Sequence, residues 1–125
     1  IAENDYFLSE VTKLFKFSWC AKIFPNGTQN GKGTHLAVYV ELLKGDQTPT
    51  SFVYQIEIKP TNEKSPIITR KYTSFFQPND SWGWNKIVTI DSLTKNYLDK
   101  DGALSLTISI SPSSYEFCIK QKKDK

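Results

Sequence analysis

The residues that most often carry enzyme chemistry are sparse in this 125-residue sequence. It contains one histidine, His35, and two cysteines, Cys20 and Cys118, which are far apart and form no CxxC pair. The acidic residues show none of the spacings that bind zinc, and no base stands close to either cysteine in sequence to activate it as a nucleophile. We therefore predict a protein that is not an enzyme, with no catalytic residues, no metal site and no cofactor.

Phosphate and nucleic-acid binding are disfavoured as well. Gly27, Gly31 and Gly33 lie between predicted strands and match no phosphate-binding loop. The net charge is +3, and much of it belongs to a lysine-rich tail at 120–125, which is typical of a solvated terminus. No apolar run approaches the roughly 20 residues that span a membrane. We expect neither nucleic-acid binding nor membrane insertion.

The cysteine usage bears on the compartment. Two free thiols fit a reducing environment, so we expect a cytoplasmic protein. Two glycosylation triplets, Asn26-Gly27-Thr28 and Asn79-Asp80-Ser81, point instead to secretion, although such triplets arise by chance in a chain rich in Asn, Ser and Thr. Secretion is the less favoured alternative, and the redox state of the two cysteines would separate the two.

One run of aromatic residues indicates a binding surface. Residues 82–87 read WGWNKI and follow a turn-rich loop at 76–81. A glycine between two tryptophans lets another backbone approach closely, and the flanking rings offer apolar faces with polar edges. Such a run is suited to gripping a peptide. Trp82 itself fits a core position or a groove position equally well.

Hydrophobic alternation with a period of two predicts a chain made almost entirely of strands. Turn-forming Gly, Pro and Asn residues separate the segments, and the helical candidate is 91–98, capped by Asp91 or Ser92. We predict an all-β fold, an antiparallel β-sandwich of seven to eight strands in a single domain over 1–125. Residues 1–14 are predicted to be mixed loop or a short helix. The predicted strands are 15–24, 34–43, 52–59, 67–76, 84–90, 103–111 and 115–120.

The same alternation assigns side chains to faces. Phe15 and Trp19 share the inner face of the first predicted strand, and Trp19 and Phe76 are expected to lie in the core. Tyr39 has the opposite parity to Val38 and Val40. Its ring is therefore expected to be exposed.

Four runs, taken in order, resemble the MATH domain (meprin and TRAF homology), also called the TRAF-like domain. They are Phe15 with residues 19–27 (WCAKIFPNG), residues 35–42 (HLAVYVEL), Phe76 with residues 82–87 (WGWNKI), and Leu93 with residues 97–98, Asp101 and the strand from Leu104. Together they cover about 15–110. The family's opening strand is not visible before Phe15. Ser74 stands where ubiquitin-ligase members carry a groove aromatic, a role that Tyr72 could take.

The resemblance implies a non-catalytic module that binds short, extended peptide motifs in a shallow groove on one sheet, as in adaptor and ubiquitin-pathway proteins. Binding by the isolated domain should be weak, with oligomerisation left to segments outside this chain. The rings are expected to gather on one solvent-facing wall. The groove residues carried over from the family are Tyr39, Tyr54, Trp82, Gly83 and Trp84, with Ser74 and Asp80 as further members.

Other interpretations stay open at this point. The chain could be a structural or self-association module of a larger protein, secreted or not, and the exposed aromatics also suggest a carbohydrate-binding sandwich, which no calcium motif supports. In the family, the first and last strands are neighbours. The strand at 115–120 would therefore fold against 103–111 in the vacant first-strand place, or else begin another repeat.

Overall fold

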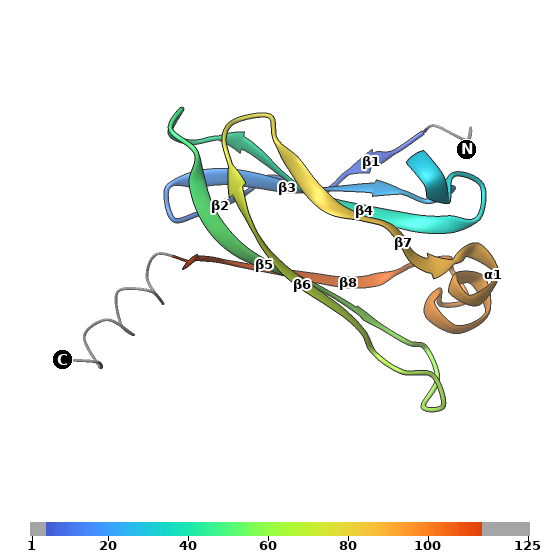
Figure 1. Cartoon of the computed structure of the whole chain (residues 1–125). Coiled ribbons are helices and arrows are strands. Elements are labelled where there is room, and N and C mark those ends of the chain that lie inside the picture. The colour runs from blue at the N-terminus through green and yellow to red at the C-terminus, as the bar shows by residue number, and fades with distance from the viewer. Residues whose placement is uncertain (1–4, 114–125) are drawn as a thin grey trace.

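Two antiparallel sheets pack against each other in the computed structural model, which describes residues 5–113 (Figure 1). One sheet has the order β1-β3-β4-β7, with β2 also paired to β3; the other has the order β6-β5-β8. The predicted antiparallel β-sandwich is confirmed. The strands of the first sheet are β1 (Phe7–Leu8), β2 (Thr12–Leu14), β3 (Phe17–Phe24), β4 (His35–Lys44) and β7 (Ser81–Thr89); those of the second are β5 (Thr50–Lys59), β6 (Ile68–Phe76) and β8 (Ser105–Pro112).

The core lies between the sheets because the central strands alternate strictly in hydrophobicity. In β4, every second side chain from Leu36 to Leu42 is almost fully buried, and β5 repeats the pattern from Phe52 to Ile58. Each such side chain contributes roughly 1.5–3 kcal/mol when it leaves water. Apart from Ala37, which is fully buried, the outward residues of the same strands are half-buried or exposed, which fixes the register of the pairing.

A cluster of aromatic rings fills one part of this core. Trp19 of β3 stands edge-on to Phe52 of β5, with ring centroids 4.8 Å apart, and to Phe76 of β6, with centroids 5.2 Å apart. The indole N–H of Trp19 donates a hydrogen bond to the Leu14 carbonyl (3.3 Å). The cluster therefore ties three strands from both sheets together, and it confirms the predicted core positions of Trp19 and Phe76.

The predicted helix at 91–98 is confirmed with a shifted start. Helix α1 (Ile90–Ser92) continues directly into one π-helical turn, η2 (Leu93–Tyr97). Its cap is Thr89, whose hydroxyl accepts from the Ser92 amide, rather than Asp91 or Ser92. A further short helix, η1 (Gln29–Gly31), precedes β4. Within the described residues, the helices fall well short of the length and apolarity needed to cross a bilayer.

The prediction of mixed loop or a short helix for residues 1–14 missed two short strands in the described part, residues 5–14. Strands β1 and β2 occupy the outer edge of β3, where Phe7 pairs with Ile23 and Thr12 pairs with Trp19. These strands are two and three residues long, and their side chains are exposed, so they carry no alternation that sequence reasoning could detect.

The predicted first strand also began too early. Phe15 and Lys16 form the tight turn between β2 and β3, with φ angles of 56° and 66°. The Phe15 ring is accordingly exposed instead of core. The strand predicted at 115–120, and its pairing with 103–111, lie outside the described residues.

Candidate functional site

Strand β7, which carries the aromatic run, forms one edge of its sheet. Among the described strands it pairs with β4 alone, and β6 likewise pairs with β5 alone at the edge of the other sheet. Figure 1 shows β7 in the upper sheet and β6 in the lower one. Two hydrogen bonds join these edges, from the Trp82 indole to the Phe75 carbonyl (2.9 Å) and from Arg70 Nη2 to the Ile87 carbonyl (3.3 Å). We call the region between these two bonds the β6–β7 seam.

The hydrogen-bond ladder shows which backbone groups of β7 face outward. The Leu42 amide donates to the Asp80 carbonyl (3.0 Å), so the backbone groups of these two residues point toward each other between β4 and β7. Bonded and non-bonded pairs alternate along antiparallel strands, and β4 and β7 keep their register from Glu41–Ser81 to Val38–Trp84. Trp82 therefore faces β4 with its backbone groups. The N–H and C=O of Gly83 point to the open edge.

The predicted site residues do not share one wall, contrary to expectation. Trp82 and Trp84 pair with Val40 and Val38 and have the parity of the core, whereas Tyr39 has the opposite parity and lies on the outer face of the sheet. A strand sends successive side chains to opposite faces, so the two tryptophans and Tyr39 are divided between the two sides of the same edge.

The inner side is formed by rings of unequal exposure. Trp82 is 44% exposed, and Trp84 is half-buried with its ring 5.4 Å from that of Tyr54. Tyr54 is only 2% exposed, so the prediction that its ring lines an open groove was wrong. The reason is its place on the inner face of the central strand β5, where Phe76 packs against it with ring centroids 5.6 Å apart.

Strand β6 contributes Ser74 and Tyr72 to this inner side. The hydroxyl groups of Ser74 and Tyr54 lie 3.3 Å apart and are hydrogen-bonded. Burial raises the pKa of Tyr54, the hydrogen bond from Ser74 opposes this, and nearby Tyr72 raises it further. Tyr72 is 64% exposed on the same parity as Ser74. The suggestion that Tyr72 supplies the groove aromatic in place of Ser74 stays a prediction.

The other two predicted residues have structural roles. The Asp80 carboxylate accepts a hydrogen bond from the Gln77 amide (3.0 Å) and so closes the turn before β7. At Gly83, a Cβ would lie 2.6 Å from the Tyr39 Cα and closer still to the Val38 carbonyl oxygen. The missing side chain therefore makes room for β4. The expectation that it also lets a peptide backbone approach stays a prediction.

On the outer side, Tyr39 lines a small hollow that the sequence did not reveal. It has a volume of about 130 Å³ and is lined by Lys22, Phe24, Thr28, Gln29, Tyr39 and Ser81. Lys22 Nζ lies 4.3 Å from the centre of the Tyr6 ring and 3.9 Å from the Glu41 carboxylate, which also accepts from the Ser81 hydroxyl (2.9 Å). Burial raises the pKa of Tyr39. Only the strand register, which sequence does not give, brings these side chains together.

Comparison with known families decides the identity of the fold. The family model of the MATH domain matches residues 1–110, nearly all of the described chain. The chain belongs to the MATH domain family. MATH domains are protein-interaction modules, and the predicted resemblance is confirmed over a longer range than the four motifs covered.

Relatives of this MATH domain include ubiquitin-pathway proteins. E3 ubiquitin-protein ligase TRIM37 of Mus musculus is 27% identical over 105 residues, which cover 80% of this chain and 11% of that protein. A TNF receptor-associated factor family protein of Dictyostelium discoideum is 25% identical over 108 residues, covering 85% of this chain and 20% of its own length. The chain thus spans only a small part of these relatives.

The solved structure of TRAF5 from Notothenia coriiceps has the same fold. It superposes with a TM-score of 0.73 over 85% of this chain and 62% of that one, at 16% sequence identity. This similarity concerns the sandwich fold alone and gives no information about a ligand.

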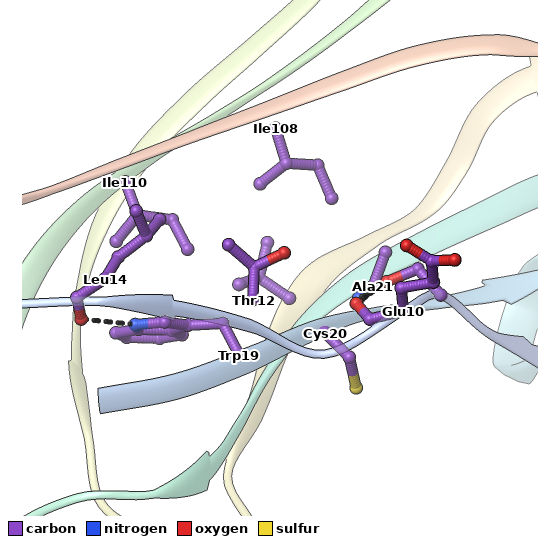
Figure 2. Close-up of a pocket in the computed structure, with 10 residues that line it drawn as sticks. Glu10, Thr12, Leu14, Trp19, Cys20, Ala21, Ile108 and Ile110 are labelled. Carbon is purple, nitrogen blue, oxygen red and sulfur yellow. Dashed lines mark hydrogen bonds between the residues drawn. The ribbon is translucent and has the colours of Figure 1, made fainter. Parts of the chain in front are cut away.

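A further cavity of the MATH domain lies on the side away from the β6–β7 seam. It has a volume of about 110 Å³ and lies between β2 and β3 on one side and β8 on the other, with Trp19, Ile108 and Ile110 among its walls (Figure 2). Cys20 borders it, but its sulfur points away from the isoleucines. Across the described residues, no three His, Cys, Asp or Glu side chains are placed to hold a metal ion.

Cys20 should behave as an inert thiol. It is buried, and its pKa is raised above the ordinary value of 9.0 by burial and by the Glu41 carboxylate, against a smaller opposing effect of Lys22. A raised pKa leaves less thiolate at neutral pH. In a Cys118→Ser variant at pH 7.5, alkylation by iodoacetamide should be at least about tenfold slower than in the same variant unfolded in urea. Equal rates in the two states would show that the thiol is accessible and reactive.

Proposed function

We propose that this MATH domain binds an extended segment of a partner protein along the open edge of β7. The observation that carries the proposal is the outward direction of the Gly83 N–H and C=O, which leaves a donor and an acceptor free for a further strand. Addition of a peptide strand to an exposed sheet edge is a common mode of recognition, in which main-chain hydrogen bonds supply affinity.

The two-sided arrangement of rings supports a ligand with alternating character. A strand beside β7 sends successive side chains to opposite faces. On the inner side they would meet Trp82, Trp84 and Tyr72. On the outer side they would meet the polar hollow beside Tyr39 and Ser81. The preferred segment would therefore alternate apolar residues with polar, hydrogen-bonding residues.

The affinity of the isolated domain should be modest. Burying one apolar side chain contributes roughly 1.5–3 kcal/mol. Ordering a flexible peptide offsets much of this gain, so we expect a Kd on the order of micromolar or weaker. Segments outside this chain that bring several copies together would raise the effective affinity.

A role as a non-catalytic adaptor in the ubiquitin pathway follows from the same proposal. MATH domains are generally non-catalytic, and the curated relatives include an E3 ubiquitin-protein ligase of which this chain covers only a small part. In such a protein, the domain would select the partner while other domains perform the chemistry. A cytoplasmic location fits this role.

Backbone methylation of a bound peptide tests the proposed pairing. Peptides would be selected from a random library displayed on phage, and the best binder would be resynthesised with one N-methylated amide at a time. Strand pairing uses every second amide, so the methylated series should lose affinity with a period of two, by about tenfold or more at the paired positions. A loss with no period, or none at all, would contradict strand addition at β7.

A matched pair of aromatic substitutions locates the binding face. Trp82→Ala should weaken binding of the selected peptide by about tenfold or more, because it removes an exposed ring at the seam. Phe75→Ala removes a more exposed ring, which lies on the face of β6 opposite to that of Tyr72 and Ser74, and should leave the Kd within about twofold. Calorimetric titration would measure both, with urea unfolding as a check that each variant is folded. Equal effects would place the ligand elsewhere.

Self-association is the second candidate, and one observation favours it. The first two strands and their turn expose several apolar side chains, and exposed apolar surface is often found at protein contacts. Sedimentation velocity across a concentration series would reveal dimers that a Phe7→Ser variant abolishes. The exposed apolar residues are Phe7, Leu8, Val11, Leu14 and Phe15.

A further inference from the structure

A second concave surface lies at the opposite side of β4 from β7. It has a volume of about 700 Å³ and opens where the β2–β3 turn meets the end of β4. We call it the basic hollow, because three of its lining residues are lysines and none is acidic. It is lined by Val11, Lys13, Lys16, Ser18, Leu43 and Lys44.

Strand register places two of the lysines on either side of a serine. Lys13 of β2 pairs with Ser18 of β3, and Ser18 in turn pairs with Lys44 of β4. The three residues lie side by side across the sheet and all line the hollow; an irregularity in the register between Ser18 and Trp19 brings Lys44 opposite Ser18. The Cα atoms of the two lysines are about 10 Å apart. An anionic group above Ser18 would lie between two ammonium groups.

Ser18 is the buried polar residue in this row, with 8% of its surface exposed. No hydrogen bond of its hydroxyl is found within the described part of the chain, and no buried side-chain oxygen there lacks a partner, so the hydroxyl keeps contact with solvent in the hollow. A ligand atom that accepts its proton takes the place of water there. The hydroxyl is therefore available at the floor of the hollow.

Among the described residues, Lys13, Lys16 and Lys44 form no ion pair, in contrast to Lys22, which pairs with Glu41, and Lys95, which pairs with Asp91. Like charges close together on one sheet face repel each other. A bound anion would remove that repulsion and would gain charge-assisted hydrogen bonds.

The turn beside the hollow is held in an unfavourable backbone conformation. Phe15 and Lys16 both have positive φ, 56° and 66°, a region that side chains other than Gly and Asn rarely adopt. The conformation holds the Lys16 side chain at the rim and leaves the Phe15 ring exposed beside it. Such conformations persist where the surrounding structure enforces them, and they occur often at binding sites.

We propose that the basic hollow binds an acidic segment of a partner protein. A carboxylate or phosphorylated side chain of that segment accepts from the Ser18 hydroxyl and lies between Lys13 and Lys44, and an adjacent apolar side chain contacts Val11 and Leu43. The concave shape with an apolar lining suits a peptide better than a flat membrane surface. Since the order of the sheet is β3-β4-β7, the site is separate from the β7 edge, and a partner could engage both.

Amide chemical shifts measured during titration with a model peptide test the proposal. The probe is an acetylated peptide of alternating glutamate and leucine, and its lysine–leucine counterpart is the control. We expect shifts centred on Ser18 and Lys44, binding that weakens as salt is added, and no response to the lysine peptide. The double variant Lys13→Gln/Lys44→Gln should weaken binding by about tenfold or more. Ser18→Ala should weaken it by about threefold or more because the hydroxyl is lost.

The matched control removes the same charge from another place. Lys59 and Lys64 are exposed lysines at the far end of β5, and Lys59→Gln/Lys64→Gln should leave the affinity within about twofold. An equal loss in both double variants would mean that only net charge matters and would overturn the proposal. So would binding to phosphatidylserine vesicles without any binding of the glutamate peptide. Because Trp82→Ala leaves the hollow intact, it should not alter this binding, so failure here is distinct from failure at β7.

Discussion

Replacing Phe76 by alanine should destabilise the domain by about 3–5 kcal/mol, the range measured for removing large aromatic side chains from protein cores. Phe76 is fully buried at the end of β6. Its ring contacts Trp19, Phe52 and Tyr54 with centroids 5.2, 6.1 and 5.6 Å away, so it joins both sheets. The truncation leaves a cavity that rigid rings on three sides cannot close. The free energy of unfolding in urea would measure the loss.

The neighbouring residue provides the control for this prediction. Phe75 is the same residue type on the same strand, but its parity is opposite and its ring is 64% exposed. Phe75→Ala should change the free energy of unfolding by no more than about 0.5 kcal/mol. If the two variants lost similar stability, the assignment of faces in β6 would be wrong, and with it the register between β5 and β6.

The sequence predicted the central strands well because burial and alternation coincide there. In β4 and β5, one face is covered by the opposite sheet and the other is not, so hydrophobicity repeats with the period of the strand. The limits of β4 and of β8 differ from the prediction by one or two residues at most. The short helix after β7 was also predictable from the spacing of Leu93 and Tyr97, both of which are buried.

The first two strands were not predicted, because burial does not produce an alternating pattern in them. Phe7, Leu8 and Leu14 are exposed, so no alternation marks β1 or β2. What fixes β2 is a tight turn at Phe15 and Lys16, residue types that give no sign of a left-handed backbone. The turn also places Phe15 outside the core. The alternation of the following strand had predicted that Phe15 lies inside it.

The aromatic run was recognisable in the sequence, but the geometry around it was not. The aromatic run does lie on an edge strand, but sequence does not reveal which sheet covers which side of that edge. Tyr54 has the parity of the core residues Phe52 and Ile56, but the family resemblance placed it in the groove, and that prediction was wrong. The outer hollow beside Tyr39 depends on Lys22, seventeen positions away and brought opposite by the β3–β4 register. Contacts of this kind are determined by the register of strand pairing, which the sequence does not reveal.

Gly83 offers the sharpest test of the geometry at the site. Gly83→Ala should destabilise the domain by about 3 kcal/mol, at the upper end of the cost of overpacking. The added methyl group would lie 2.6 Å from the Tyr39 Cα and closer still to the Val38 carbonyl oxygen. These are backbone atoms, so no side chain can rotate away. Strands β4 and β7 would have to move apart, which weakens the ladder that presents the outer edge.

Gly102 is the appropriate control because an added methyl group there meets nothing. Its φ is +78°, so Gly102→Ala pays only the conformational cost of a left-handed residue, about 1 kcal/mol. Urea unfolding of both variants, together with a titration of the peptide selected for β7, separates two roles of Gly83. If Gly83→Ala were as stable as the wild type and only peptide binding were lost, the glycine would be making room for the ligand. If Gly83→Ala loses more stability than Gly102→Ala, Gly83 is needed for the packing of β4 on β7. Peptide binding then depends on Gly83 indirectly, because the glycine positions the backbone of β7.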